Sequence, residues 1–568
     1  MAKGTARAKT DRASRGAALA PARGAVTPVE GGLAGFIEAH AGPLLALLIV
    51  AYTLIFSGLN WYRIRTLRQG FDFLVYEQPI WNTVHGRPFE QSMYSFSTTH
   101  LGVDLALFEL WIAPFYAIWW SPMTLFALIS LGAGLGAWPL FLIARERFSS
   151  ALVGLGWAFL YLLFLPVGTI TLAEFQPRLF AASALLGAYW FYRQKRAIPF
   201  WICLVIALTV RSDVGLVVGT FGLYAILDRR DARFGLLPAI VGFGYWIVAV
   251  FLIIPALANG HGFLWQVNYT WLGENTRAIV TTVVTHPLYT AQGVFTLEKG
   301  RYLAQLLWPL AFLPLLRPRL LLIPAPILAL NLLSGELVQF DLFHQYQALI
   351  IPFLFIGAIE GLAILRAAEG SARLWRLGIL VVAATVAAIL LLPIWPGSAD
   401  DRNGLLPTMH PLVWPILLAL LLAPAALGAL IQRWPQASRT MPVALAGLAV
   451  LMLLQHLALG SEPLRFVKNP HASPRLAAAQ AVIALVPPNA PLAVTSQLGI
   501  QVPMRRYLYH FPGNSSYDPA LVARAAYVIG DRQRDNGREA TDIAALVKSG
   551  RWQIIADRSD FVLLRQIP

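Results

Sequence analysis

The sequence predicts a polytopic α-helical membrane protein of about thirteen spanning helices, with a long first outer loop and a small C-terminal α/β domain. Of its 568 residues, 57% are hydrophobic and only 13% are charged, whereas soluble domains carry nearer a quarter charged residues. Mean hydropathy is +0.61, and apolar runs long enough to cross a bilayer recur along the chain. The single cysteine, Cys203, excludes an intramolecular disulfide and a cysteine-based metal cluster.

Residues 1–40 are expected to form a disordered basic tail on the cytoplasmic side, because lysines and arginines are spread there among Ala, Gly, Pro and Thr. The net charge of +15 does not indicate nucleic-acid binding, since the basic residues stand in short clusters between apolar runs, as topology signals do. The first apolar run, 43–59, has no small-residue cleavage site directly after it, which is typical of an uncleaved signal anchor.

Residues 41–460 are predicted to form the membrane domain. Its apolar stretches lie at about 42–60, 122–144, 149–168, 178–192, 197–210, 214–227, 234–257, 302–316, 320–335, 347–365, 377–396, 409–431 and 440–460. One further stretch, 105–120, is ambiguous because it contains Glu109 and Pro114. Whether it crosses decides the orientation of every later span.

Charge placement resolves this ambiguity. If the N-terminus is cytoplasmic and 105–120 lies at the membrane surface, every cytoplasmic connection is basic, as at Arg145, Arg193 and Arg229. If 105–120 crosses, the later connections invert and the positive-inside rule fails repeatedly. We therefore predict a multi-pass protein of the bacterial cytoplasmic (inner) membrane, with residues 461–568 outside.

Two of the predicted spans are short. Residues 197–210 and 214–227 are 14 residues each, about 21 Å if helical, against a hydrocarbon core of about 30 Å. The connecting Arg211-Ser212-Asp213 should therefore lie below the outer surface, where charges usually face a cavity or a partner.

Residues 461–568 change character and predict an extracytoplasmic α/β domain. Strands are expected at 491–496, 507–511, 526–529, 552–556 and 561–565, and helices at 476–485 and 540–548. The domain carries no Walker, dinucleotide-binding or zinc signature.

The first outer loop, 61–121, contains a segment that fits a helix lying on the membrane, with Asp72 and Glu77 near its ends. A carboxylate at the membrane surface can act as a general base toward a hydroxyl or bind a cation. The alternative is that Asp72 caps this helix, since Asp is a favoured N-cap residue.

Other candidate groups come from separate connections on the same predicted side. His100 and Asp104 share a helix face if that stretch is helical, and they suit either a phosphate or metal site or a structural pair. Buried arginines suit bidentate capture of a phosphate, although Arg–Asp pairs can also merely close a loop. The remaining candidates are Glu174, Arg178, Arg211, Asp213, His344 and Tyr346.

Taken together, several motifs resemble a family. Phe71-Asp72, Glu77-Gln78, Trp81-Asn82 and His85-Gly86, followed by His100, Glu174-Phe175-Gln176-Pro177, Arg211-Ser212-Asp213 and His344-Gln345-Tyr346, resemble the domain-of-unknown-function 2079 family of bacterial membrane proteins over roughly 45–565. Two positions depart from the expected pattern: Gln176, where a histidine is expected, and Ser212, commonly acidic. No role is therefore assigned to either.

That family is similar to the GT-C glycosyltransferases, integral membrane enzymes that take a sugar from a polyprenyl-phosphate carrier on the outer face. The resemblance implies a GT-C-like bundle, with Asp72 as the base and Arg178 and Arg211 on the carrier phosphate. Glu77, Glu174 and Asp213 would orient sugar hydroxyls or bind a divalent cation, which is the one cofactor expected as an option. His100, His344 and Tyr346 would line the acceptor side, beside Asp104.

Two other functions remain open at this point. A transporter or flippase for an anionic lipid or sugar would also use short helices with charges at depth, although no repeated halves are visible in the sequence. A non-catalytic envelope assembly protein would tolerate loss of Asp72. The sugar, the acceptor and the oligomeric state do not follow from the sequence.

Overall fold

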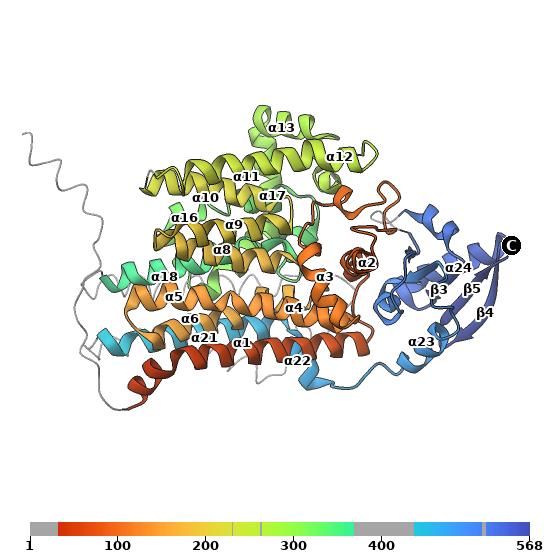
Figure 1. Cartoon of the computed structure of the whole chain (residues 1–568), viewed down its shortest axis with the longest axis horizontal. Helices are drawn as coiled ribbons and strands as arrows, with labels where there is room; N and C mark the ends of the chain where they lie inside the picture. Colours follow the sequence, from red (N-terminus) through yellow and green to blue (C-terminus); the bar gives the residue numbers. More distant parts are fainter. Residues whose placement is uncertain (1–31, 230, 262–263, 368–436, 514–517, 568) are drawn as a thin grey trace, which may run out of the picture.

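The computed structural model describes residues 32–229, 231–261, 264–367, 437–513 and 518–567. A helical bundle forms most of the chain, and a small α/β domain lies at one end of it (Figure 1). The bundle helices are α1 Leu33–Arg65, α4 Pro122–Leu135, α5 Ala137–Phe148, α6 Ala151–Leu163, α7 Leu165–Leu172, α8 Arg178–Arg193, α9 Ala197–Val210, α10 Val214–Arg229, α11 Leu236–Val248, α12 Ile254–Leu257, α15 Leu297–Leu307, α16 Pro318–Leu321, α17 Ala325–Leu333, α18 Ile351–Ala367 and α21 Ala437–Leu459.

Among the described residues, four helical stretches are long and apolar enough to cross a membrane by length and composition, at Gly35–Arg65, Pro122–Phe148, Leu236–Leu257 and Met441–Leu459. A fifth is counted if α6 and α7, bent by 48°, form one span. The break falls where Phe164 is extended and Pro166 follows, because proline cannot continue the hydrogen-bond ladder of a preceding helix. The predicted spans 377–396 and 409–431 lie outside the described residues, so the total of thirteen stays a prediction.

Three other features differ from the sequence expectation. Helix α1 begins at Leu33, so residues 33–40 of the expected tail are helical, with a kink at His40. The expected spans 302–316 and 320–335 are not single helices. The first is the end of α15 followed by two 3-10 helices, and the second is the two short helices α16 and α17 joined by a turn. Prolines at 309, 314, 318 and 324 interrupt these segments, because each removes a backbone donor.

The first outer loop contains two helices, α2 Asp72–Val84 and α3 Glu109–Ile118. At 10 residues, α3 is about 15 Å long and too short to cross a bilayer, as the charge argument required for 105–120. Helix α2 is anchored by Phe73 and Ile80, which are fully buried, and the Phe73 ring stacks on Phe126 of α4 at 4.7 Å. Figure 1 shows α2 and α3 between the bundle and the α/β domain.

The C-terminal domain is a five-stranded sheet between helices, preceded by α22 Glu462–Lys468. Its elements are α23 Leu476–Ile483, β1 Leu492–Thr495, β2 Leu508–Phe511, β3 Tyr527–Asp531, α24 Arg538–Lys548, β4 Trp552–Arg558 and β5 Phe561–Gln566. All five strands and both helices lie where the alternation of apolar residues predicted them. The strand order is β2-β1-β3-β5-β4. Strand β1 is parallel to both of its neighbours, β2 and β3. Strand β5 is antiparallel to both of its neighbours, β3 and β4.

Successive residues of β1 face opposite sides of the sheet, as strand geometry requires. Leu492 and Val494 join the core that contains Val482 of α23, while Ala493 packs in a second core with Ile543 of α24. The two helices thereby cover the two faces, which leaves the ends of the parallel strands available to carry polar groups.

The α/β domain docks onto the first outer loop through hydrogen bonds between side chains of the loop and the backbone of the domain. Ser92 donates its hydroxyl to the Leu508 carbonyl at 2.8 Å and accepts the Leu508 N–H at 3.0 Å. Gln78 of α2 donates to the Arg506 carbonyl at 2.8 Å. Gly499 lies so close to α2 that an added Cβ would meet Leu74 at 2.4 Å. The loop, the domain and the bundle therefore pack as one unit.

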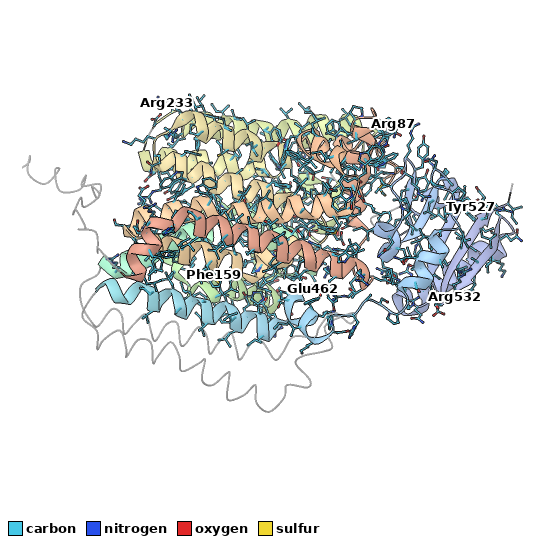
Figure 2. All side chains as sticks on the ribbon, turned by 60° about the horizontal axis from the view of Figure 1, so that its bottom comes forward. Arg87, Phe159, Arg233, Glu462, Tyr527 and Arg532 are labelled. Carbon is cyan, nitrogen blue, oxygen red and sulfur yellow. The ribbon has the colours of Figure 1, made fainter. Side chains whose placement is uncertain are left out.

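The remaining described helices belong to the outer connection before α15. They are α13 Thr276–Thr285 and α14 Pro287–Val294, which follow a 3-10 turn at Leu264–Tyr269. Arg233 lies at the opposite end of the bundle from the α/β domain (Figure 2).

Candidate functional site

The N-terminus of α2 meets three connections of the bundle at the end that carries the α/β domain. Asp72 is the first residue of α2 and is exposed. The residue at the N-cap is Phe71, and no side chain makes a capping hydrogen bond there. The structure therefore does not bear out the alternative that Asp72 serves as the N-cap, although a carboxylate in the first turn is favoured by the helix dipole.

Glu174 lies directly beside this helix end. Its carboxyl accepts a hydrogen bond from the Phe73 backbone N–H, and a Cβ added to Gly70 would lie 1.8 Å from Glu174 Oε1. Glu174 also has a positive φ of 61°, a strained conformation for a non-glycine residue that tends to occur at functional sites. The backbone is held so that the carboxyl packs against Gly70.

Burial raises the pKa of Glu174 well above its usual range, and the negative charge of Asp72 raises it further. The charges of Arg63 and Arg534 and the Phe73 N–H act in the opposite direction. Burial therefore favours the protonated form of Glu174, the enclosed acid of the two.

Two arginines on the neighbouring connections are paired with aspartates in a buried chain. Arg178 Nη2 lies 2.7 Å from Asp213 Oδ2, and Arg211 Nε lies 2.7 Å from Asp104 Oδ2 and 3.5 Å from Asp213 Oδ2. Arg178 starts α8 directly after Pro177, and Arg211 follows the last residue of α9. The connection between α9 and α10 thus buries Arg211 within the protein, while its predicted depth below the outer membrane surface stays a prediction.

Besides Arg211 Nε and Asp104 Oδ2, which lie 2.7 Å apart as an ion pair, three buried atoms of these residues and of Glu174 have no hydrogen-bond partner among the described residues. They are Arg178 Nη1, Glu174 Oε2 and Asp213 Oδ1. Buried polar atoms are rarely left unpaired, because desolvation without a bond costs about 1–3 kcal/mol. The Arg178 guanidinium also lies over the Tyr346 ring at 5.5 Å from its centre. The arrangement suits a polar ligand that offers an anionic oxygen to Arg178 and hydroxyls to the acids.

Other predicted site residues have different partners. His100 Nδ1 pairs with Glu109 of α3, so the expected His100–Asp104 pair does not form, because the chain makes a 3-10 turn at His100–Gly102. His344 Nδ1 pairs with Asp341 at 2.8 Å. Glu77 is buried and accepts a hydrogen bond from the Tyr116 hydroxyl at 2.8 Å, and burial raises its pKa to about 8. Glu77 thus joins α2 to α3.

Sequence reasoning missed Tyr76 and the edge of the α/β domain. Tyr76 is buried one turn after Asp72. Burial raises the pKa of Tyr76 to about 12, and the charges of Arg211, Asp104, Arg178 and Asp72 have smaller effects on it. The i,i+4 spacing from Asp72 was the signal that could have found this residue. The ring of His510 packs edge-on against Phe71 at 4.6 Å, and no local pattern predicted that contact. No group of three or more His, Cys, Asp or Glu side chains that could hold a metal ion occurs in the described ranges.

A family model described as "Predicted membrane protein (DUF2079)" matches residues 63–415. The chain belongs to this family. All ten predicted site residues, from Asp72 to Tyr346, lie inside the matched range, while the α/β domain lies beyond it. The DUF2079 match is therefore narrower than the 45–565 likeness inferred from the motifs. A search of curated proteins finds no match.

Two solved structures share the fold of this DUF2079 protein. One is ArnT from Cupriavidus metallidurans bound to undecaprenyl phosphate, with a TM-score of 0.51 and 14% identity over 92% of this chain and 98% of that chain. The apo structure of the same ArnT gives a TM-score of 0.50 and 13% identity over the same shares. The predicted resemblance to GT-C glycosyltransferases is thus confirmed at the level of the fold.

Proposed function

We propose that this protein is a membrane glycosyltransferase that moves a sugar, with inversion, from a polyprenyl-phosphate carrier to an acceptor outside the cytoplasm. The observation that carries this proposal is the exposed Asp72 beside the enclosed Glu174, next to Arg178 with an unpaired buried nitrogen. The fold likeness to an ArnT structure that holds undecaprenyl phosphate supports a lipid carrier of that class.

Asp72 is the proposed general base, since it is the exposed acid at this helix end. It accepts the proton of the acceptor hydroxyl while the hydroxyl oxygen attacks the anomeric carbon of the sugar. The bond from that carbon to the carrier phosphate breaks, and its electron pair leaves with the phosphate. A positioned base of this kind contributes about 10²–10⁴-fold to the rate.

Arg178 and Arg211 are proposed to stabilise the charge that develops on the leaving phosphate. Both are already held by aspartates, so their orientation is set before the carrier arrives, which is where electrostatic stabilisation is most effective. Burial raises the pKa of Glu174 and so favours its protonated form, which can donate a hydrogen bond to a sugar hydroxyl. No step requires a divalent cation, which stays a prediction.

The orientation in the membrane is part of the same proposal. The start of α1 and the α/β domain lie at opposite ends of the bundle (Figure 1), and we place the former in the cytoplasm and the latter outside the inner membrane. In a Cys203→Ala background, cysteines at the exposed Ser149 and Ser549 should react with an impermeant thiol reagent from opposite sides. Reaction of both from one side would refute this orientation.

The direct test is consumption of labelled donor by the purified full-length protein. A panel of radiolabelled polyprenyl-phosphate sugars is supplied to the wild type, to Asp72→Asn and to Asp231→Asn. Asp231 is a matched control, because it pairs with Arg233 at the far end of the bundle (Figure 2). We expect Asp72→Asn to lose at least about 10²-fold in rate and Asp231→Asn to be unchanged.

The outcomes separate the alternatives. Donor consumption that persists in Asp72→Asn would reject Asp72 as the base. If the wild type neither turns over nor binds any lipid-linked sugar, the glycosyltransferase proposal fails. Binding without turnover, together with movement of the lipid across a vesicle membrane, would favour a transporter.

A further inference from the structure

The carboxyl ends of β1, β2 and β3 form one edge of the α/β domain. Strand β1 lies between β2 and β3 and is parallel to both, so the chain leaves β1 toward one neighbour and returns on its other side. In parallel sheets, ligands bind outside the carboxyl ends of the strands at such a change of direction.

This edge carries polar side chains that bond to one another. Ser496, directly after β1, lies 2.7 Å from His510 Nε2 of β2. Gln497 donates to Asp531 at the end of β3, and Asp531 also accepts two hydrogen bonds from Arg475, at 2.5 and 3.1 Å. Arg534 donates to Gln497 Oε1 at 3.2 Å.

The same edge faces the end of α2 that carries Asp72. His510 contacts Phe71, the residue before Asp72, and Gln501 donates to the Ile64 carbonyl at the end of α1 at 2.7 Å. Arg534 lies close enough for its charge to act on both Glu174 and His510. The polar edge therefore lies beside the proposed catalytic acids.

Arg534 differs from Arg475 in how its charge is compensated. Arg475 makes two hydrogen bonds to the Asp531 carboxylate. In the described part of the chain, Arg534 donates a hydrogen bond to the neutral amide of Gln497, and the carboxylates of Asp535 and Glu539 lie 3.8 Å from its Nε. Burial also raises the pKa of Glu539 to about 7, so this neighbour carries only part of its charge at neutral pH.

We propose that Arg534, positioned by Gln497, binds an anionic group of the acceptor, a carboxylate or phosphate carried near the hydroxyl that Asp72 deprotonates. This rests on the proposed function and adds a substrate class to it. The carrier phosphate is assigned to Arg178 and Arg211, which lie among the bundle helices that a lipid tail can reach. An acceptor that arrives from outside meets the domain edge first.

The test measures equilibrium binding to the full-length protein in lipid nanodiscs. Two soluble probes, octyl β-glucoside and octyl β-glucuronide, are alike except that the second carries a carboxylate. The third probe is undecaprenyl phosphate. The variants are Arg534→Gln and the matched control Arg532→Gln, since Arg532 pairs with Asp557 on the outer part of the same domain (Figure 2).

We expect the wild type to prefer the glucuronide by about tenfold, the effect of one charge-assisted contact of about 1.4 kcal/mol. Arg534→Gln should reduce that preference to near one and leave undecaprenyl phosphate binding unchanged, while Arg532→Gln keeps the preference. Equal thermal unfolding midpoints of the two variants would show that neither has lost its fold.

Three results would overturn the proposal: no preference in the wild type, a preference that survives in Arg534→Gln, or its equal loss in both variants. Weaker binding of undecaprenyl phosphate in Arg534→Gln would instead assign Arg534 to the carrier. Failure of the proposed function is distinguishable, because it appears as absent donor consumption in the wild type whatever the glucuronide preference.

Discussion

The two ends of the bundle both gather arginines and carboxylates, but in opposite proportions. At the far end, one acid serves three arginines: Glu360 lies 2.5 Å from Arg193, 3.1 Å from Arg147 and 3.8 Å from Arg317. At the end next to the α/β domain, Arg178 and Arg211 are accompanied by Asp104 and Asp213, and Tyr76 lies within reach of the charges of both arginines and of Asp72, which in turn acts on Glu174.

The difference separates a structural cluster from a candidate site. Both oxygens of Glu360 are used, and they join α5, α8 and α18, which is what an ion cluster at a helix end needs in order to fix packing. The other end has surplus acids and the unpaired atoms Arg178 Nη1, Glu174 Oε2 and Asp213 Oδ1. The far-end cluster leaves Arg317 Nε without a hydrogen bond among the described residues, but both oxygens of its acid are occupied by arginines. At the other end two carboxylate oxygens and one arginine nitrogen are left over, and this surplus indicates a ligand.

The largest expected effect comes from removing one arginine at each end. Arg178→Ala should lower the rate of donor consumption by about 10²-fold, the usual cost of one transition-state contact. Arg193→Ala should lower the thermal unfolding midpoint with little change in rate, since it removes the arginine nearest to the Glu360 carboxylate and leaves this partly buried charge less well compensated. Donor consumption and thermal unfolding are measured on both variants. An equal loss of rate in both would contradict the distinction between the ends.

A smaller effect is expected from Gly70→Ala, which moves Glu174 without removing it. The added methyl group would lie 1.8 Å from Glu174 Oε1, so the carboxyl must shift, and small misplacements near a reacting centre cost about tenfold or more in rate. Gly300→Ala is the control, because nothing lies within 4 Å of its added Cβ. An unchanged turnover rate in Gly70→Ala would remove Glu174 from the proposed site.

The smallest effect concerns Glu77 and shows only in the pH dependence of stability. Burial raises its pKa from 4.5 to about 8, so between these values the folded state holds more protons than the unfolded state. The stabilisation that Glu77 contributes to the folded state is therefore greatest below pH 4.5 and is lost as pH rises through about 8. Glu77→Gln should flatten this decline, measured as the unfolding midpoint between pH 6 and 8.5. The exposed Glu274 supplies the control Glu274→Gln, and a decline of equal slope in Glu77→Gln would reject this assignment.

Local pattern predicted those parts of the fold in which each residue's environment depends on near neighbours. The strands of the α/β domain and helix α2 lie where alternation and helical spacing placed them. The broken segments between Leu297 and Leu333 were not predicted, because hydropathy alone does not register how closely spaced prolines divide an apolar run.

The candidate site was predicted in composition but not in pairing. Asp104, Arg178, Arg211 and Asp213 do meet, yet spacing suggested His100 as the partner of Asp104, and a tight turn gave His100 to Glu109 instead. Arg534 was out of reach of any local argument, because its neighbours at the site come from the other end of the chain. Those contacts are set by domain docking.

The docking of the α/β domain onto the first outer loop has a consequence for how the protein is made. Ser92 and Leu508 are 416 residues apart in sequence, so the loop leaves the ribosome long before its partner exists. Until the α/β domain has been made, Leu74 and Phe71 lack the surface that covers them. Contacts between residues this far apart in sequence form late in folding. This loop is therefore among the first segments to be made and the last to be finished, and the proposed site around Asp72 assembles only when translation ends.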